Sequence, residues 1–210
     1  MSSKLISELM QRFESEAEPG YSERVAKLFD LNVEGYLGVR IPKIRKIAQE
    51  YFHHIKKLSG KECLEICDSL LETGVYELKI TAYQWAGKSV KKYSPDDIYH
   101  FESWLISYTT DWADCDDICA QVLGPFFIQF PEQTQICQNW AESKNIWVRR
   151  ASLVSLIKPV KKDLMIDHAL LIASKLKDDT EPMVKKALKW FLTQASKRHP
   201  EKIEAFRAIH

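Results

Sequence analysis

The sequence lacks the features of a membrane protein, a fibrous protein or a disordered chain. No apolar run approaches the ~20 residues that a transmembrane helix needs, and the first 18 residues carry charges in every turn, unlike a signal peptide. Glycine and proline are scarce, at 7 and 8 of 210 residues, while 45% of the chain is hydrophobic. We therefore expect a single domain over residues 1–210, in the cytoplasm and without a membrane partner.

Cysteine is also sparse, and its five positions leave two interpretations. Cys63 and Cys67 are four residues apart, as are Cys115 and Cys119, whereas Cys137 stands alone. Each pair would share one face of a helix, where two thiolates could bind a metal. Zinc usually takes closer cysteine pairs or added histidines, and no histidine lies near either pair. Since free cysteine is among the most buried residue types, we favour core packing and expect no metal.

Charge is balanced overall but unevenly distributed. Residues 1–143 hold 15 Lys and Arg against 22 Asp and Glu, whereas residues 144–210 hold 15 against 7. The asymmetry indicates an anionic partner for the C-terminal third. A chance clustering of lysine-rich solvent faces explains it equally well.

Helix signals dominate, and no segment alternates apolar and polar residues long enough to predict a strand. Leu5, Leu9 and Phe13 recur every four residues, and Pro42 suits the first turn of a helix. Residues 94–97, Ser-Pro-Asp-Asp, combine a cap, a proline and two acids. Four glycines between the periodic segments predict turns or helix stops: Gly20, Gly60, Gly74 and Gly124.

Internal repetition determines the expected architecture. Similar helical segments begin at Tyr76, Trp112, Ile146 and Pro182, which are 36, 34 and 36 residues apart. Each interval accommodates two helices and short turns, the unit of a helical solenoid. A lone hairpin cannot cover its apolar face, so neighbouring hairpins must stack. The sequence thus predicts an all-α, HEAT-like superhelix of antiparallel helical hairpins.

Equivalent positions within these repeats carry charges. Two repeats place Arg149–Arg150 and Lys185–Lys186 at the third to fifth positions, whereas the repeat that begins at Trp112 is acidic there and contains Asp116. Equivalent positions of a stacked array point the same way, so the cations should form a row. A carboxylate within that row is not needed for packing, which makes it a candidate for chemistry.

Four residues on corresponding faces of adjacent repeats are candidates for a site: Trp112, Asp116, Arg150 and Trp190. Each has an ordinary structural explanation. Trp190 would usually pack in the core, and Arg150 would usually be solvated or paired with an acid. Trp112 lies in a polar context, where exposure is more plausible, and it is one turn before Asp116.

Several segments together resemble the bacterial AlkD-like DNA alkylation repair proteins, over roughly residues 35–200 and in matching order. The segments are GYLGVRIPKIRKIAQEY from Gly35, DWADCDDI from Asp111, NIWVRRASLVSL from Asn145 and PMVKKALKWFLTQASKRHP from Pro182. The resemblance implies a HEAT-like DNA glycosylase that removes positively charged N3- or N7-alkylated purines without extruding the base, unlike most glycosylases. It implies no cofactor.

By motif position, the resemblance implies that Asp116 is the catalytic carboxylate, that Trp112 and Trp190 are the tryptophans of the cleft, and that Arg150 contacts phosphate. These residue types suit the chemistry. An alkylated purine carries positive charge, so its departure needs no protonation, and a carboxylate stabilises the oxocarbenium-like sugar. Indole faces attract cations. The expected DNA-binding residues are Arg149, Arg150, Lys185, Lys186 and Lys189.

Three functional hypotheses follow. The first is a monomeric N-glycosylase acting on double-stranded DNA without metal or cofactor. The second is a non-catalytic DNA-binding protein of the same fold that holds damaged or branched DNA. The third is a peptide-binding scaffold, which would not require Asp116 between two tryptophans and therefore ranks last.

Overall fold

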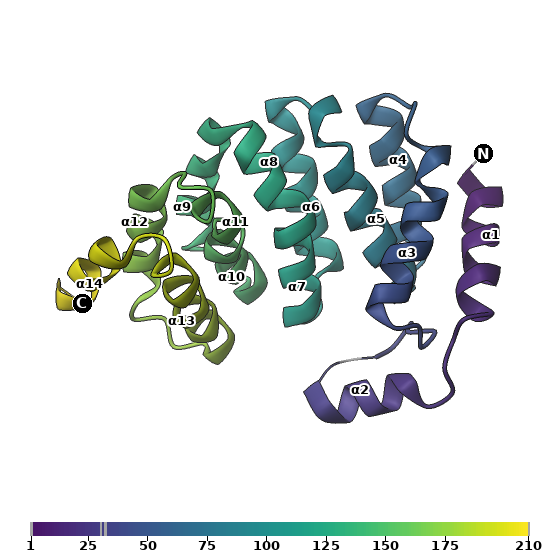
Figure 1. Cartoon of the computed structure of the whole chain (residues 1–210), viewed down its shortest axis with the longest axis horizontal. Helices are drawn as coiled ribbons and strands as arrows, with labels where there is room; N and C mark the ends of the chain where they lie inside the picture. Colours follow the sequence, from purple (N-terminus) through teal and green to yellow (C-terminus); the bar gives the residue numbers. More distant parts are fainter. Residues whose placement is uncertain (1, 30, 32, 210) are drawn as a thin grey trace. The chain divides into compact units, whose positions relative to one another are not determined.

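The computed structural model describes residues 2–29, 31 and 33–209, and these residues form helices without any strand. The all-α prediction is therefore confirmed. The chain groups into two compact units, Met1–Tyr93 and Ser94–His210, which are described separately (Figure 1). The single domain expected over residues 1–210 stays a prediction. Within the described residues, no helix is both long enough and apolar enough to cross a membrane.

The first unit contains five α-helices and two 3-10 turns among its described residues. Their bounds are α1 Ser2–Glu14, α2 Tyr21–Phe29, α3 Ile41–Tyr51, η1 Phe52–His54, α4 Gly60–Leu71, α5 Tyr76–Lys88 and η2 Val90–Lys92. Helix α5 is the centre of this unit, because it packs against both α4 and α3. Trp85 of α5 is fully buried and donates its indole N–H to the carbonyl of Ala48 on α3 at 2.7 Å.

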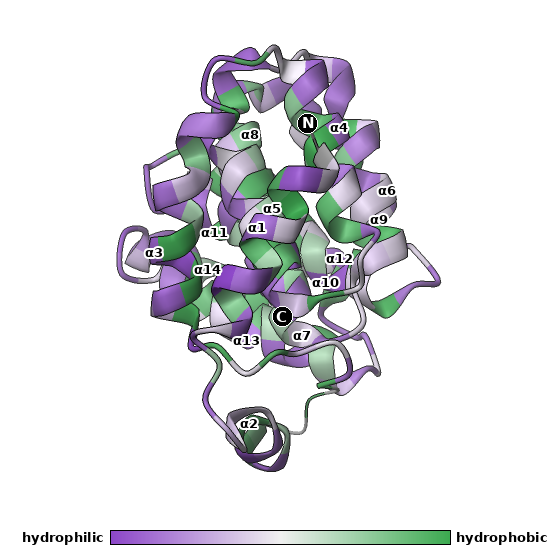
Figure 2. Ribbon diagram, turned by 90° about the vertical axis from the view of Figure 1, so that its right-hand side faces the viewer, coloured by the Kyte–Doolittle hydropathy of each residue, from purple (hydrophilic) through white to green (hydrophobic). Residues whose placement is uncertain are grey.

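Helix α2 differs from its neighbours in that none of its residues is buried. Its apolar residues Leu28 and Phe29 remain exposed. Figure 2 shows α2 standing clear of α1 and α3, with hydrophobic and hydrophilic residues mixed along it. Tyr21, at its start, lies beneath the guanidinium of Arg40, 5.3 Å from the ring centre.

A buried carboxylate fixes the loop that leads into α3. Glu77 of α5 has no exposed surface, and its two oxygens accept the backbone N–H groups of Leu37, Gly38 and Val39 at 3.0, 3.0 and 3.1 Å. Gly38 has a φ of +99°, a conformation that other residues rarely adopt. The loop is thus held by charge-assisted hydrogen bonds to a single side chain.

The second unit continues the helical hairpins to the end of the described chain. Its α-helices are α6 Ile98–Tyr108, α7 Trp112–Ile118, α8 Gly124–Gln129, α9 Ile136–Trp140, α10 Ile146–Val154, α11 Ile157–Val160, α12 Ile166–Leu176, α13 Pro182–Ala195 and α14 Pro200–Ile209. Short turns connect them: η3 Pro95–Asp97, the π-helical η4 Cys119–Leu123 and η5 Pro131–Gln135. Helix α10 packs against α7, α9 and α13, which makes it the central helix of this unit.

The repeat and capping predictions agree with the observed boundaries. The four repeated segments begin where α5, α7, α10 and α13 begin. Pro42 lies in the first turn of α3. Ser94 and Asp97 form a reciprocal capping box before α6, although residues 95–97 themselves form a 3-10 turn. All five cysteines are buried, which confirms core packing.

Two of the four glycine predictions are wrong. Gly20 and Gly74 do lie in turns, but Gly60 is the first residue of α4 and Gly124 lies within a continuous run from α7 through the π-helical turn to α8. At Gly124, an added Cβ would meet the Cβ of Lys158 at 3.0 Å and the carbonyl of Cys119 at 3.1 Å. Close approach of α11, rather than a helix stop, explains this glycine.

Candidate functional site

The candidate site is built at the N-terminal ends of three successive repeat helices, α7, α10 and α13. Asp111 caps α7, because its carboxylate accepts the N–H groups of Ala113 and Asp114 at 2.8 and 3.0 Å. Asp114 is buried and accepts both the N–H and the hydroxyl of Thr110. These two acids therefore organise the start of α7. Asp116, one turn after Trp112, makes a different kind of contact.

Asp116 and Arg150 form a two-bond ion pair between α7 and α10. The Nε and Nη2 atoms of Arg150 each donate to one oxygen of Asp116, both at 2.9 Å. The Asp116 side chain is 20% exposed and that of Arg150 only 6%. Parallel bonds of this geometry fix both distance and orientation. The structure thus brings together two predicted site residues that are 34 positions apart.

Arg150 also anchors the next repeat. Its Nη1 atom donates to the carbonyl of Met183 in the first turn of α13, at 2.5 Å. One buried guanidinium therefore connects α7, α10 and α13. Trp190 lies seven residues beyond Met183, about two turns along the same side of α13. Its side chain is 36% exposed, so it is not a core tryptophan.

The electrostatics of Asp116 reflect two opposing effects. Burial raises the pKa of its carboxyl group above the ordinary aspartate value, and the hydrogen bonds and charge of Arg150 act in the opposite direction. Carboxyl groups whose pKa is raised by burial beside a specific partner are frequent at functional sites. Trp112, at the start of the same helix, is half-buried.

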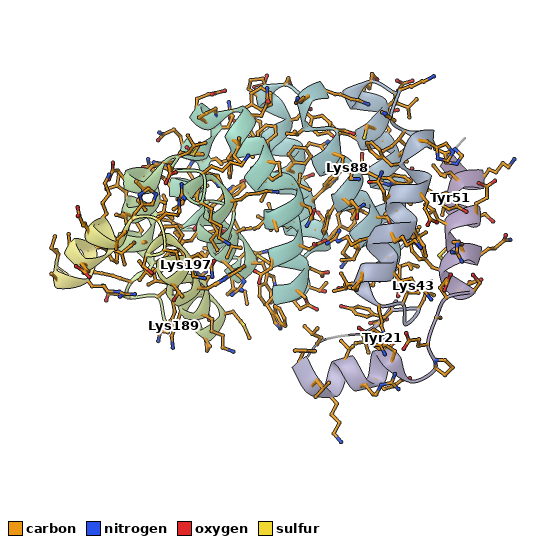
Figure 3. All side chains as sticks on the ribbon, in the orientation of Figure 1. Tyr21, Lys43, Tyr51, Lys88, Lys189 and Lys197 are labelled. Atoms are coloured by element: carbon orange, nitrogen blue, oxygen red, sulfur yellow. The ribbon has the colours of Figure 1, made fainter. Side chains whose placement is uncertain are left out.

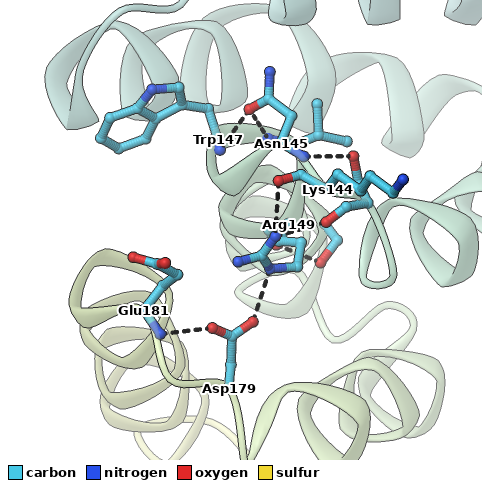
Figure 4. Close-up of polar contacts among 9 residues, drawn as sticks. Lys144, Asn145, Trp147, Arg149, Asp179 and Glu181 are labelled. Atoms are coloured by element: carbon cyan, nitrogen blue, oxygen red, sulfur yellow. Dashed lines mark hydrogen bonds and ion pairs between the residues drawn. The ribbon is translucent and has the colours of Figure 1, made fainter.

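Arg149 has a structural partner of its own (Figure 4). Its Nε atom donates to Asp179 at 2.8 Å, and its Nη1 atom donates to the carbonyls of Ser143 and Lys144 at 2.6 and 3.2 Å. Asp179 in turn accepts the N–H of Glu181, just before α13. Arg149 therefore joins the turn before α10 to the turn before α13. Contact of Arg149 and Arg150 with DNA stays a prediction.

The three predicted lysines of α13 are exposed: Lys185, Lys186 and Lys189. Sequence reasoning missed two contributors, Asp179 and the carbonyl of Met183. A backbone carbonyl gives no residue-type signal, and Asp179 sits in an ordinary polar turn. Among the described residues, no group of three or more His, Cys, Asp or Glu side chains could hold a metal ion.

Comparisons with known proteins place this geometry in context. A family model described as "DNA alkylation repair enzyme" matches residues 9–210. A structure described as a predicted DNA alkylation repair enzyme from Enterococcus faecalis superposes with a TM-score of 0.81 at 15% identity, covering 93% of this chain and 90% of that one. No curated protein sequence matches the chain.

Two further solved structures share the fold. AlkD2 from Streptococcus mutans gives a TM-score of 0.61 at 19% identity, with 88% and 86% of the two chains covered. The alkylpurine DNA glycosylase AlkC from Pseudomonas fluorescens, solved with DNA containing an abasic site analog, gives 0.50 at 18% identity and covers 96% of this chain but 57% of its own. At these identities the likeness concerns the fold, which is that of AlkD-type helical repeat proteins.

Proposed function

Because the chain belongs to the DNA alkylation repair enzyme family, we propose that it is a monofunctional DNA N-glycosylase that excises cationic N3- or N7-alkylated purines. Asp116 is its catalytic residue, and Trp112 and Trp190 flank the charged base. The observation that carries the proposal is the buried Asp116–Arg150 pair, which holds a carboxylate in one orientation. Trp112 of the same helix and Trp190 of α13 are both incompletely buried. The protein works in the cytoplasm as a monomer on double-stranded DNA, without a cofactor.

The chemistry requires little of the protein. The bond between N9 of the alkylated purine and C1′ of the sugar breaks, and its electron pair neutralises the positively charged base. The sugar becomes an oxocarbenium-like cation, which the carboxylate of Asp116 stabilises. Water then adds to C1′ and releases a proton, which leaves an abasic site. Since the departing base is already cationic, no acid is needed and the base can stay stacked in the duplex.

Arg150 has a positioning role in this scheme. Its two bonds to Asp116 orient the carboxylate and offset the burial that would otherwise favour the protonated form. Three of its five N–H groups are occupied within the protein, and its side chain is only 6% exposed, so a DNA phosphate would reach it only at this small exposed part. The exposed Lys185, Lys186 and Lys189 supply sequence-independent affinity for the backbone.

Release of 7-methylguanine from methylated DNA tests the proposal. Wild type and Asp116→Asn are incubated in parallel under single-turnover conditions, with unfolding curves recorded for both. Loss of one preorganised electrostatic contact should reduce the rate on the order of 10²–10³-fold, while binding to undamaged duplex persists. Equal release by both proteins would refute the assignment of Asp116. Release by neither, with DNA still bound, would favour a non-catalytic DNA-binding protein.

A further inference from the structure

A second surface of α13 holds cations around a groove. Lys185, Leu188, Lys189, Leu192 and Arg207 line a groove of about 290 Å³ where α14 packs against α13. The two leucines are half-buried and form its apolar floor, and the three cations are exposed. Figure 3 shows Lys189 at the outer surface of α13, near the C-terminal end of the chain. Among the residues that the structure describes, no acidic side chain lines the groove.

Half of the twelve other Lys and Arg residues of the second unit are paired with a carboxylate. These six are Arg149, Arg150, Lys175, Lys177, Arg198 and Lys202. Within the part of the chain that the structure describes, Lys185, Lys189 and Arg207 have no carboxylate partner. Three uncompensated positive charges around one groove favour an anion from outside the protein.

Helical geometry separates this groove from the candidate site. Lys185 and Lys189 are one turn apart, as are Leu188 and Leu192, so the four share one side of α13. Trp190 projects roughly 100° around the helix from Lys189. The groove and the tryptophan therefore occupy different flanks of the same helix.

We propose that this groove binds the sugar–phosphate backbone of duplex DNA beyond the lesion, with Arg207 as an additional phosphate contact. The inference rests on the proposed function. Phosphates alternate along the backbone with deoxyribose rings whose faces are apolar, and the groove offers cations above an apolar floor. An arginine provides a planar fork that matches phosphate oxygens, and the lysines add point charges. The contact is independent of base sequence.

The salt dependence of DNA binding tests the contact. Arg207→Gln is compared with Arg198→Gln, a matched control that removes the same charge from an arginine already paired with Asp163. Duplex affinity is measured by fluorescence anisotropy over a range of salt concentrations. Loss of one phosphate contact should lower the log–log slope by about 0.9. We expect that decrease for Arg207→Gln, with little change of the slope for Arg198→Gln.

The outcomes distinguish the groove from the glycosylase proposal. Equal slopes for wild type and both variants, or equal losses in the two variants, would overturn the groove while leaving the function of Asp116 intact. A wild-type protein that binds no duplex would overturn both. Inorganic phosphate, titrated at constant ionic strength, is the final arm. Displacement of DNA from wild type but not from Arg207→Gln would support a phosphate contact at Arg207, whereas equal displacement from both would count against it.

Discussion

The buried pair between Asp116 and Arg150 allows a quantitative test by a double-mutant cycle. Arg150→Met removes the partner of a carboxylate that is only 20% exposed, and Asp116→Leu leaves a guanidinium that is 6% exposed without a counter-charge. Breaking a buried pair in this way typically costs about 3–5 kcal/mol, because the remaining charge is buried and uncompensated. Each single variant should therefore lose about that much of its free energy of unfolding.

The double variant should behave differently. With both charges replaced by apolar side chains of similar size, no uncompensated charge remains, and such replacements are often neutral or stabilising. We expect Asp116→Leu/Arg150→Met to recover most of the loss. The two single losses sum to about 6–10 kcal/mol and the double variant should lose only about 1 kcal/mol, so the coupling free energy should be about 5 kcal/mol or more. Recovery will be incomplete, because the hydrogen bond from Arg150 to the carbonyl of Met183 is also lost.

Urea denaturation followed by circular dichroism measures all four proteins. The surface pair of Arg198 and Asp163, whose side chains are 52% and 51% exposed, provides the control. Arg198→Met should cost much less than either single variant of the buried pair, because exposed ion pairs contribute little. A double variant that loses the sum of the two single losses would refute the energetic coupling of Asp116 and Arg150. Single losses as small as that of the control would show that breaking this pair costs no more than breaking an exposed one.

Three further predictions follow from the geometry. Glu77→Gln should lower the free energy of unfolding by about 3 kcal/mol in urea titrations, because an amide cannot accept all three N–H groups. Glu62→Gln, at an exposed helix cap, should cost clearly less, and equal losses would contradict the argument. The excision rate, corrected for spontaneous base loss, should fall as the pH drops through a midpoint above the ordinary aspartate pKa. Burial raises the pKa of Asp116, and only its ionised form stabilises the sugar cation. An excision rate that is independent of pH would exclude that role for Asp116. Gly124→Ala should destabilise the protein by about 1–3 kcal/mol in thermal unfolding, because the Cβ of the alanine would lie 3.0 Å from the Cβ of Lys158. An unchanged melting temperature would show that α11 moves aside freely.

The fold could be predicted well because its signals are local. Pro42, the capping residues Ser94 and Asp97, and Pro182 each act within one turn, so the boundaries they mark did not depend on distant contacts. The prediction for Gly124 failed because a tertiary contact prevailed over the local preference. Nothing in the neighbouring sequence indicates that Lys158 comes so close.

The candidate site could be predicted only in part. Repeat spacing placed Asp116 and Arg150 on corresponding helices, but the two hydrogen bonds between them depend on side-chain rotamers that spacing does not determine. The partnership of Arg149 with Asp179 was missed for the same reason. Trp190 has apolar neighbours in the sequence, which favour burial, yet it lies on the exposed side of α13.

The loop before α3 has a consequence for how this sequence can vary. Its three hydrogen bonds to Glu77 come from backbone N–H groups, which every residue except proline provides. Leu37 and Val39 can therefore drift to many other residues without loss of these bonds, whereas proline at either position removes one. Among natural variants, Leu37 should diverge while Glu77, forty residues downstream, persists. A deep mutational scan would reveal this as tolerance at Leu37 and intolerance at Glu77, with Gly38 restricted by its positive φ and Val39 by its burial.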